Sequence, residues 1–320
     1  MRHVTVRQLQ IFAEAAEALS FARVAEHLNL TPAAVSFQIK QIEAQTGCTL
    51  FERIGKTARL TTAGAALLGY ARQVLQALTD ADRAMRALQG AEGGQVTLGL
   101  VTTATYFVPH VLARFQAAAP QIAIQLIDGN RLQIFDLMAK GHVDLMVTGQ
   151  PPHEADVTSA AFADHPSVIV AAPGHRLAGR DRLRMADLAA EPFLLREDGS
   201  GTRALMDRFF AEAGLKPRIG MVSSSNETIK QAVMAGMGLA LISRHTIGLE
   251  LGHGRLAVLQ VEGFPLMRSW FISHRRTLQL LPAHKRLRSF VIDQSSGIID
   301  VLEAEYRRFG STQVPGCGAR

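Results

Sequence analysis

The chain has 320 residues, enough for two or more domains that each bury a hydrophobic core. Hydrophobic residues make up 48% and charged residues 19% of the sequence, as in an ordinary soluble globular protein, and the formal net charge is +6. Residues 1–60 contain seven Lys or Arg and five Asp or Glu residues. Binding of nucleic acid there would therefore depend on where the charges lie rather than on bulk charge.

No targeting or membrane segment is expected. The start of the chain lacks an apolar stretch of signal-peptide length, and no run of about 18 apolar residues occurs. The two cysteines, Cys48 and Cys317, cannot form a disulfide framework and are typical of a reducing cytoplasm. Cys48 is either a redox switch or a small packed thiol, and the packed thiol is the simpler interpretation. We expect a cytoplasmic protein without a membrane partner.

Residues 6–48 predict three short helices joined by tight connections. Ser20 and Thr31 can cap the second and third helices, and residues 29–30 make the turn between them. Pro32 stands at the first position of the third helix, where its missing N–H costs nothing. The residues expected to point inward are Leu9, Phe12 and Ala16 in the first helix, Phe21, Val24, Ala25 and Leu28 in the second, and Val35, Ile39 and Ile42 in the third.

Helix, small residue, tight turn and capped helix in this order indicate a helix-turn-helix. Ala25 occupies the position where the two helices cross, and a larger side chain would force them apart. The alternative is a three-helix unit that packs only its own core. Residues 50–64 favour the first interpretation because they predict a basic hairpin, or wing, with Arg53, Lys56 and Arg59 at its tip. Such a wing can contact phosphates beside the groove that the helix enters, although a basic hairpin alone is usually a solvated turn.

Residues 62–89 predict a long helix with an apolar seam. The seam residues are spaced alternately four and three apart over about three heptads. A helix that packs only on its own domain would show a wider apolar stripe. The spacing therefore favours a dimerising helix, and a two-fold pair of reading heads suits palindromic DNA. The seam consists of Leu67, Ala71, Val74, Leu78, Ala81, Met85 and Leu88.

The second part of the chain, after a glycine-rich hinge at residues 90–94, alternates strands with helices. This pattern predicts a parallel sheet covered on both faces. It breaks at residues 150–152, Gln-Pro-Pro, and a second set then indicates a second α/β lobe. The tail, residues 310–320, is expected to be disordered. Strands are expected at 96–101, 122–129 and 143–149, with helices at 107–120 and 132–141, and the second lobe has helices at 202–213 and 227–234.

Two α/β lobes predict a cleft where strand ends meet helix N-termini. Polar loops lie at these junctions, and their hydroxyl and free N–H groups suit an anionic or hydroxylated ligand. For any single residue among them, simple helix capping is the alternative. The candidates are Thr102, Thr103 and Thr105; Asn130 and Arg131; Thr148 and Gly149; Ser200, Gly201, Thr202 and Arg203; and Ser225 and Asn226.

Enzyme chemistry has little support in the sequence. Residues 197–203 lack the GK[ST] element of a Walker motif, and Asp198 stands where a nucleophile elbow requires glycine. The dipeptide at 153–154, His-Glu, lacks a second histidine at metalloprotease spacing, and the other histidines are scattered. We expect no catalytic residue and no metal. An enzyme of periplasmic-binding-protein type with an N-terminal interaction module, and a nucleoid-binding structural protein, are the alternatives from other classes.

The run from Ala25 to Gly64, AEHLNLTPAAVSFQIKQIEAQTGCTLFERIGKTARLTTAG, closely resembles the N-terminal signature of LysR-type transcriptional regulators. The resemblance covers residues 1–300, because the heptad helix and the two lobes follow in that family's order. It implies an α/β protein with an all-α-plus-wing N-terminal domain: a winged helix-turn-helix, a long linker helix and a two-lobed periplasmic-binding-protein-like sensor. It also implies a return to the first lobe near residues 264–268, a homotetramer built as a dimer of dimers, and ligand-dependent bending of double-stranded promoter DNA. RNA polymerase is a candidate further partner.

Carried over by position, the resemblance assigns DNA contacts to the third helix and the wing. Phe37 is unusual where a polar residue is common, and its ring suits contact with a thymine methyl group. The full set of candidates is Thr31, Pro32, Ala33, Ser36, Phe37 and Lys40 on the helix, with Arg53, Lys56 and Arg59 on the wing.

Several stretches of the sensor resemble the CbbR group, regulators of Calvin-cycle carbon-fixation operons. They are GNR (129–131), VDLMVTGQPP (143–152), REDGSGTR (196–203) and SSNETIKQAVMAGMGLALISRHT (224–246). Thr105 stands where that group implies a lysine, and Gln150 where it implies an arginine. Both replacements remove positive charge from the expected cleft, so the ligand need not be one of the group's phosphorylated metabolites.

The sequence therefore predicts a DNA-binding domain at 1–60, a dimerisation helix at 61–89, a hinge at 90–94 and an effector-binding domain at 95–320. Within that domain, residues 95–149 and 268–300 form lobe I, and residues 150–267 form lobe II. We expect an activator of carbon-fixation genes that responds to a small anionic metabolite; a LysR-type regulator of another operon is the alternative. No cofactor is expected besides a reversible effector, for which phosphorylated metabolites and nicotinamide nucleotides are the candidates.

Overall fold

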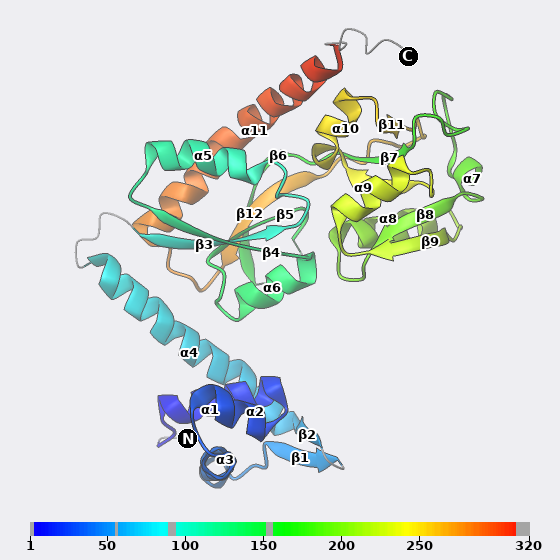
Figure 1. Ribbon diagram of the computed structural model, residues 1–320. Helices are drawn as coiled ribbons and strands as arrows, with labels where there is room; N and C mark the ends of the chain where they lie inside the picture. Colours follow the sequence, from blue (N-terminus) through cyan, green and yellow to red (C-terminus); the bar gives the residue numbers. More distant parts are fainter. Residues whose placement is uncertain (1–2, 55–56, 89–93, 152–155, 312–320) are drawn as a thin grey trace, which may run out of the picture. The chain divides into compact units, whose positions relative to one another are not determined.

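The computed structural model describes residues 3–54, 57–88, 94–151 and 156–311. The chain forms two compact units, residues 1–90 and 91–320 (Figure 1). Within the described part of the chain, no helix is both long and apolar enough to cross a bilayer. Outside the described residues lie Lys56, Gln89, the expected hinge up to residue 93, Pro152, His153, Cys317 and the tail after residue 311.

The first unit contains three short helices, a two-stranded hairpin and one long helix. These elements are α1 (Val6–Ala18), α2 (Phe21–Leu28), α3 (Pro32–Thr46), β1 (Phe51–Ile54), β2 (Thr57–Leu60) and α4 (Thr62–Leu88). The expected caps are present: Ser20 accepts a hydrogen bond from the Arg23 N–H, and Thr31 Oγ1 accepts one from the Ala34 N–H at 3.1 Å. The three helices and the antiparallel wing are therefore confirmed.

The core of the first unit lies among its helices. Phe12 and Val35 are fully buried, and burying each such side chain contributes about 2 kcal/mol of stability. Ala25 is buried where α2 meets its neighbours, as the helix crossing requires. The first turns of α4 join this core through Leu67 and Ala71. The α4 seam therefore begins as part of the domain's own core.

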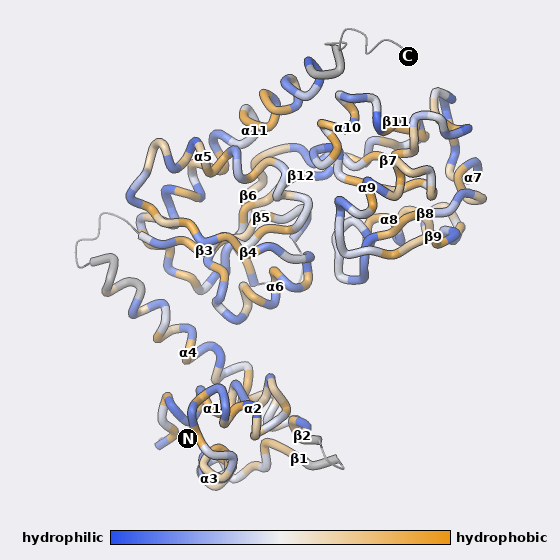
Figure 2. The backbone as a smooth tube through the Cα atoms, in the orientation of Figure 1, coloured by the Kyte–Doolittle hydropathy of each residue, from blue (hydrophilic) through white to orange (hydrophobic). Residues whose placement is uncertain are grey.

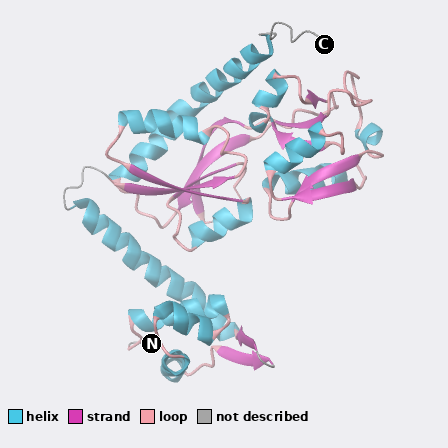
Figure 3. Ribbon diagram, in the orientation of Figure 1, coloured by secondary structure: helices cyan, strands magenta, loops and turns pink. Residues whose placement is uncertain are grey.

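The first lobe of the second unit is a five-stranded sheet with helices on both faces (Figure 3). Side chains of α5 and α11 pack on one face around Phe115 and Val291, and α6 packs on the other around Ile134. Hydrophobic residues follow the inner strands (Figure 2). The elements are β3 (Gln95–Val101), α5 (Val108–Ala118), β4 (Ala123–Gly129), α6 (Arg131–Ala139), β5 (Leu145–Thr148), β6 (Val157–Asp164), β12 (Ser269–Arg275) and α11 (Pro282–Ser311).

The sheet of the first lobe is mixed rather than wholly parallel. Strand β3 pairs in parallel with β4 and β5 as expected, but β12 is antiparallel to β5 and β6 is antiparallel to β12. Residues 157–164, which the sequence placed in lobe II, form the edge strand of lobe I. The expected crossover at residues 150–152 is therefore wrong, and the chain crosses after Asp164. The partner of β6 lies far along the chain, so its local sequence carried no signal of this pairing.

The second lobe contains two small sheets. Strand β7 lies between β10 and β11, antiparallel to both, and β8 pairs in parallel with β9. The chain re-enters the first lobe at Ser269, next to the expected return at 264–268. The elements are β7 (Ser167–Ala171), α7 (Met185–Leu188), β8 (Pro192–Arg196), α8 (Gly201–Glu212), β9 (Arg218–Ser223), α9 (Asn226–Met234), β10 (Ala240–Ser243), η1 (Arg244–Thr246), α10 (Gly248–Gly252) and β11 (Ala257–Val258).

A stack of rings lies where the chain passes between the lobes. His165 stacks on Trp270 of β12 with ring centroids 3.7 Å apart, and Trp270 Nε1 donates to His245 Nδ1 at 3.0 Å. Burial lowers the pKa of His245 to about 4, with a further contribution from Arg244. Burial also lowers the pKa of His165, and Arg268 adds to the effect. Both imidazoles are therefore neutral at neutral pH, and His245 carries its proton on Nε2.

These neutral histidines make the stability of the second unit sensitive to acid. Because the pKa of His245 is about 4 when folded and that of an unfolded histidine is about 6.5, the unfolded chain takes up protons first as the pH falls. We expect the free energy of unfolding to fall by about 2 kcal/mol between pH 7.5 and pH 5 through His245 alone. Urea unfolding followed by the fluorescence of Trp270, the single tryptophan, measures this loss.

The variant His245→Gln is expected to remove this part of the pH dependence. His110→Gln is the matched control, because His110 is exposed and outside the stack. If wild type and His245→Gln lose stability equally between the two pH values, the assignment to His245 is wrong.

Candidate functional site

The exposed face of α3 is the first candidate surface. Its inner face holds Val35 and Ile39, which are buried in the core of the first unit. Phe37 is 57% exposed, so its ring is not explained by packing and is available to an apolar partner. Of the other predicted contacts, Thr31, Pro32, Ala33 and Lys40 are exposed and Ser36 is half-buried.

A glutamine on α1 fixes the position of α3 through two hydrogen bonds. Gln8 Nε2 donates to the side-chain oxygens of Gln38 and Gln41 at 3.1 and 2.8 Å. Gln8 is buried, so these bonds are shielded from water. The exposed face of α3 is thus fixed in rotation relative to α1.

The wing carries one described cation. Arg59 on β2 is exposed and lies opposite Glu52 on β1. The backbone of Arg53 belongs to β1, but its side chain lies outside the described residues, as does the whole of Lys56.

A cavity of about 110 Å³ lies between the two lobes of the second unit. The ends of β3, β5 and β8, the first turns of α6 and α8, and the segments that cross between the lobes provide its lining. Loops that are far apart in the sequence therefore meet at one place. The predicted residues found in the lining are Thr102, Thr103, Asn130, Arg131, Gly149, Ser200, Gly201 and Thr202.

A buried arginine bonds to both lobes at this cavity. Arg196, only 4% exposed, donates from Nε and Nη2 to Glu197 at 2.8 and 3.1 Å. Its Nη1 donates to Asn226 of the same lobe, and its Nη2 donates to Thr102 Oγ1 of the other lobe at 3.1 Å. Asn226 Nδ2 also donates to Thr102 Oγ1, at 3.3 Å. Thr102 is thus the point at which the first lobe is joined to a charged group of the second.

Three further guanidinium groups give the lining its charge. Arg131 and Arg268 each have a buried Nε without a hydrogen-bond partner among the described residues, and Arg268 Nη2 donates to Ser167 Oγ at 3.3 Å. Arg208 lies at the exposed rim, 3.7 Å from Glu212. Burial, with the charges of Arg208 and Arg131, lowers the pKa of Arg268 to about 10, so it stays protonated. Glu197 compensates Arg196 but not these groups, so the cavity favours an anion.

The N-terminus of α8 also favours an anionic ligand. Ser200 Oγ caps α8 by accepting from the Thr202 N–H at 3.2 Å, and the helix begins at Gly201. The first N–H groups of a helix and its dipole favour negative charge. The loop before α8 touches the first lobe, because the Leu132 N–H donates to the Gly199 carbonyl at 3.3 Å. Gly199 has a φ of +88°, and a Cβ there would lie 3.0 Å from Leu132, so glycine is required.

His165 adds an uncharged hydrogen-bonding group to the lining. Its two ring nitrogens are buried and have no hydrogen-bond partner among the described residues. A neutral imidazole can donate one hydrogen bond and accept another. His165 is therefore suited to a ligand that carries both a hydroxyl or protonated oxygen and an anionic oxygen.

Five predicted site residues lie outside this lining. The hydroxyls of Thr105 and Thr148 donate to neighbouring backbone carbonyls at 2.8 and 3.1 Å. Ser225 caps α9, which is the capping alternative stated for such residues. Arg203 Nε donates to Asp207 at 2.9 Å. The last predicted residue, Asn226, is not in the lining itself but bonds to Arg196 behind it.

The sequence did not single out Arg196, Arg208, Arg268 or His165. Arg196 had the clearest signal, since it ends a buried strand directly before the glycine-containing loop. His165 and Arg268 come together only because the chain crosses between the lobes twice, which no local pattern shows. Of the two residues that stand where the CbbR group implies a cation, Gln150 lines the cavity and Thr105 does not. The lining remains positively charged despite both replacements.

A winged helix-turn-helix joined to a two-lobed cavity of this kind defines a ligand-responsive DNA-binding protein as a class. Residues 6–65 match the family described as bacterial regulatory helix-turn-helix protein, lysR family, and residues 89–296 match the LysR substrate binding domain. The chain belongs to the LysR family of bacterial transcriptional regulators. It is accordingly a regulator and not an enzyme.

The relatives with established names are similar over nearly their whole length. The HTH-type transcriptional regulator CbbR of Rhodospirillum rubrum is 47% identical over 290 residues, covering 91% of this chain and 96% of that protein. The RuBisCO operon transcriptional regulator of Allochromatium vinosum is 41% identical over 294 residues, covering 92% and 97%. The recognition of the family and of the CbbR group is therefore confirmed.

Solved structures show the same fold. The regulatory domain of CcmR from Synechocystis PCC6803, solved in complex with 2-PG, is 32% identical with a TM-score of 0.61 and covers 64% of this chain and 98% of that one. Full-length CbnR, solved with its target DNA, is 21% identical with a TM-score of 0.57 and covers 96% and 99%. At 21% identity the second likeness shows the fold alone.

Proposed function

We propose that this protein regulates carbon-fixation genes, those of the RuBisCO operon, by binding their promoter DNA in response to a small anionic metabolite. The observation that carries the proposal is the similarity, over more than 90% of the chain, to regulators named for these genes. In this proposal residues 1–60 bind DNA, residues 61–89 join two copies, residues 90–94 are the hinge and residues 95–320 bind the effector. Activation is the expected direction of control.

The decisive experiment is footprinting on DNA upstream of the carbon-fixation genes of the source organism, with and without candidate metabolites. Specific protection there, and loss of induced transcription when the gene for this protein is deleted, are the expected results. Protection only upstream of a different operon would support the alternative, a LysR-type regulator with another ligand.

The exposed face of α3 supports contact with the major groove. Lys40 and Phe37 project from the side opposite the core, Gln8 fixes the helix in rotation, and Arg59 on the wing can contact a phosphate. CbnR, which shares the fold, was solved with its target DNA. Cationic side chains at phosphates position the protein, and groups such as Phe37 add base contacts.

Replacing Lys40 tests this surface. We expect Lys40→Ala to weaken promoter binding about fivefold to tenfold and to lower the slope of log Kd against log salt by about one, because one phosphate contact is lost. Lys40→Arg retains the charge and should keep the wild-type slope. Fluorescence anisotropy at several salt concentrations measures both quantities. An unchanged affinity and slope in Lys40→Ala would remove Lys40 from the DNA interface.

The seam of α4 supports pairing of two copies. Beyond the turns that join the domain core, Val74, Leu78 and Met85 are 45%, 46% and 54% exposed. Apolar residues that recur at heptad spacing on an exposed helix face are covered when a second helix packs against them. The tetramer, as a dimer of dimers, and contact with RNA polymerase belong to the same proposal.

A charge placed on the seam should separate the copies. Leu78→Glu would bury an unpaired carboxylate between two helices, which costs several kcal/mol, so we expect the dimer through α4 to dissociate at micromolar concentration. Gln73→Glu is the matched control, because Gln73 is exposed and off the seam on the same helix. Light scattering gives the mass of each variant. A Leu78→Glu protein with the wild-type mass would contradict pairing through this seam.

The cavity between the lobes supports an anionic effector. Its lining combines the cations Arg131, Arg208 and Arg268 with the N-terminus of α8. The related CcmR domain was solved with 2-PG. A ligand regulates only by binding one arrangement of the lobes better than another, and this cavity is lined by both lobes.

Two arginine variants test whether the ligand contacts residues of the lining rather than residues next to it. We expect Arg268→Gln to weaken binding of phosphoenolpyruvate, or of inorganic phosphate as a simpler probe, by about tenfold to a hundredfold, because a charge-assisted contact is lost. Arg203→Gln is the matched control: the sequence suggested it as a ligand contact, but the structure pairs it with Asp207. Isothermal titration calorimetry compares the two. Equal losses, or a loss in Arg203→Gln alone, would overturn this assignment.

A further inference from the structure

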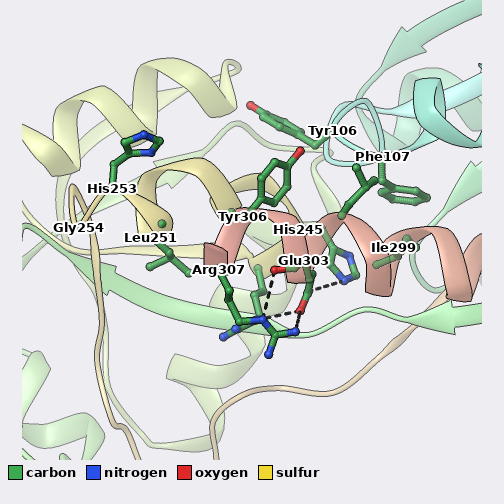
Figure 4. Close-up of a pocket in the computed structure, with 14 residues that line it drawn as sticks. Tyr106, Phe107, His245, Leu251, His253, Gly254, Ile299, Glu303, Tyr306 and Arg307 are labelled. Carbon is green, nitrogen blue, oxygen red and sulfur yellow. Dashed lines mark hydrogen bonds and ion pairs between the residues drawn. The ribbon is translucent and has the colours of Figure 1, made fainter. Parts of the chain in front are cut away.

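A second and larger cavity, of about 550 Å³, opens at the lobe junction between α10 and the C-terminal half of α11 (Figure 4). Small-molecule sites in proteins commonly have volumes of about 300 to 1,000 Å³. Tyr106, Phe107 and residues 299–307 of α11 line it from the first lobe, and residues 244–254 line it from the second. The matched LysR segment ends at residue 296, so this part of α11 lies beyond it.

Aromatic and aliphatic side chains form most of the wall. In the view of Figure 4 the rings of Tyr106, Phe107 and Tyr306 lie above the charged groups of α11. Tyr306 packs directly on the backbone of α10, because a Cβ at Gly248 would lie 2.1 Å from its ring. Lys230 Nζ lies 4.8 Å from the centroid of the Tyr106 ring, which holds that ring in place. The wall is therefore preformed.

The charged part of the lining carries an excess positive charge. Glu303 lies 3.8 Å from Arg244, 3.8 Å from Arg307 and 3.4 Å from His245. His245 accepts a hydrogen bond from Trp270 on Nδ1 and is neutral, so two guanidinium groups share one carboxylate. A ligand with one negative charge would balance this group of residues, and its apolar part would occupy the aromatic side.

We propose that this cavity is a second ligand site, for a small molecule with a flat ring system and a single anionic group. Its rings pack against Tyr106, Tyr306 and Leu251, and its anionic group takes hydrogen bonds from Arg244 and Arg307. The site is separate from the smaller cationic cavity near Arg268, because the two linings share no residue.

Occupancy of this site would act on the arrangement of the lobes. Both lobes line the cavity, so a ligand there favours the arrangement that the structure shows. His245 belongs to this lining, and it is linked through Trp270 to His165, which lines the other cavity. The proposal does not rest on the proposed carbon-fixation role.

Two fluorescent probes test the site in the full chain. Anilinonaphthalene sulfonate carries rings and one negative charge, and phenylnaphthylamine has similar rings without the charge. We expect Leu251→Trp, which fills the cavity from α10, to weaken binding of both probes at least about tenfold. Leu249→Trp is the matched control, because Leu249 lies on the same helix but is exposed outside the lining. Equilibrium dialysis measures the affinities without interference from the added tryptophan.

Charge variants give a second test that does not depend on filling the cavity. Glu303→Gln should tighten the sulfonate about threefold and Arg307→Gln should weaken it about threefold, while phenylnaphthylamine binds both variants like wild type. Arg268→Gln should leave sulfonate binding unchanged. The proposal is overturned if Leu251→Trp binds like Leu249→Trp, if the charge variants change neither probe, or if Arg268→Gln abolishes sulfonate binding, which would place the probe in the other cavity.

Discussion

A guanidinium group buried at the junction of two lobes needs hydrogen-bond acceptors on every side, and Arg196 finds them in both lobes. Its carboxylate partner, Glu197, is the next residue in the chain, so charge neutralisation is local. The remaining donors reach Asn226 and, across the junction, Thr102. Separating the lobes would leave a donor of Arg196 to find water or another acceptor, at a cost of about 1–3 kcal/mol if it stayed buried. The arrangement of the lobes and the hydrogen bonding of this charge are therefore one physical property.

This coupling explains how an anion in the cavity could act at a distance. Arg196 is already compensated by Glu197, so the ligand would be held mainly by Arg131 and Arg268, whose buried Nε groups have no described partner. These two residues come from α6 and from the segment that re-enters the first lobe, while α8 belongs to the second lobe. An anion that contacts all three binds one spacing of the lobes better than any other, which is the condition for a change in population.

The features that the sequence predicted are those in which neighbours along the chain decide the outcome. Ser20 and Thr31 cap helices because the side chain that accepts the bond lies within a turn of the N–H that donates it. The alternation of strands and helices located β3, α5, β4, α6 and β5 for the same reason. The pairing of β6 with β12 was missed because it joins distant segments, and with it the approach of His165 to Arg268. Arg203 was included as a candidate because it follows a loop that does line the cavity. Its side chain instead bonds to Asp207, and this rotamer depends on packing that periodicity does not encode.

The rings of His165, Trp270 and His245 connect the linings of the two positively charged cavities. Arg131 and Arg268 line one cavity, and Arg244 and Arg307 line the other. Burial removes the hydration that a protonated imidazole needs, and this is the main cause that lowers the pKa of both histidines; Arg268 adds to the effect at His165 and Arg244 at His245. The two imidazoles therefore stay neutral, and Trp270 stacks on His165 at van der Waals distance while its Nε1 donates to His245 Nδ1. Because Trp270 contacts His165, which lines one cavity, and His245, which lines the other, a displacement of Trp270 would move part of both linings.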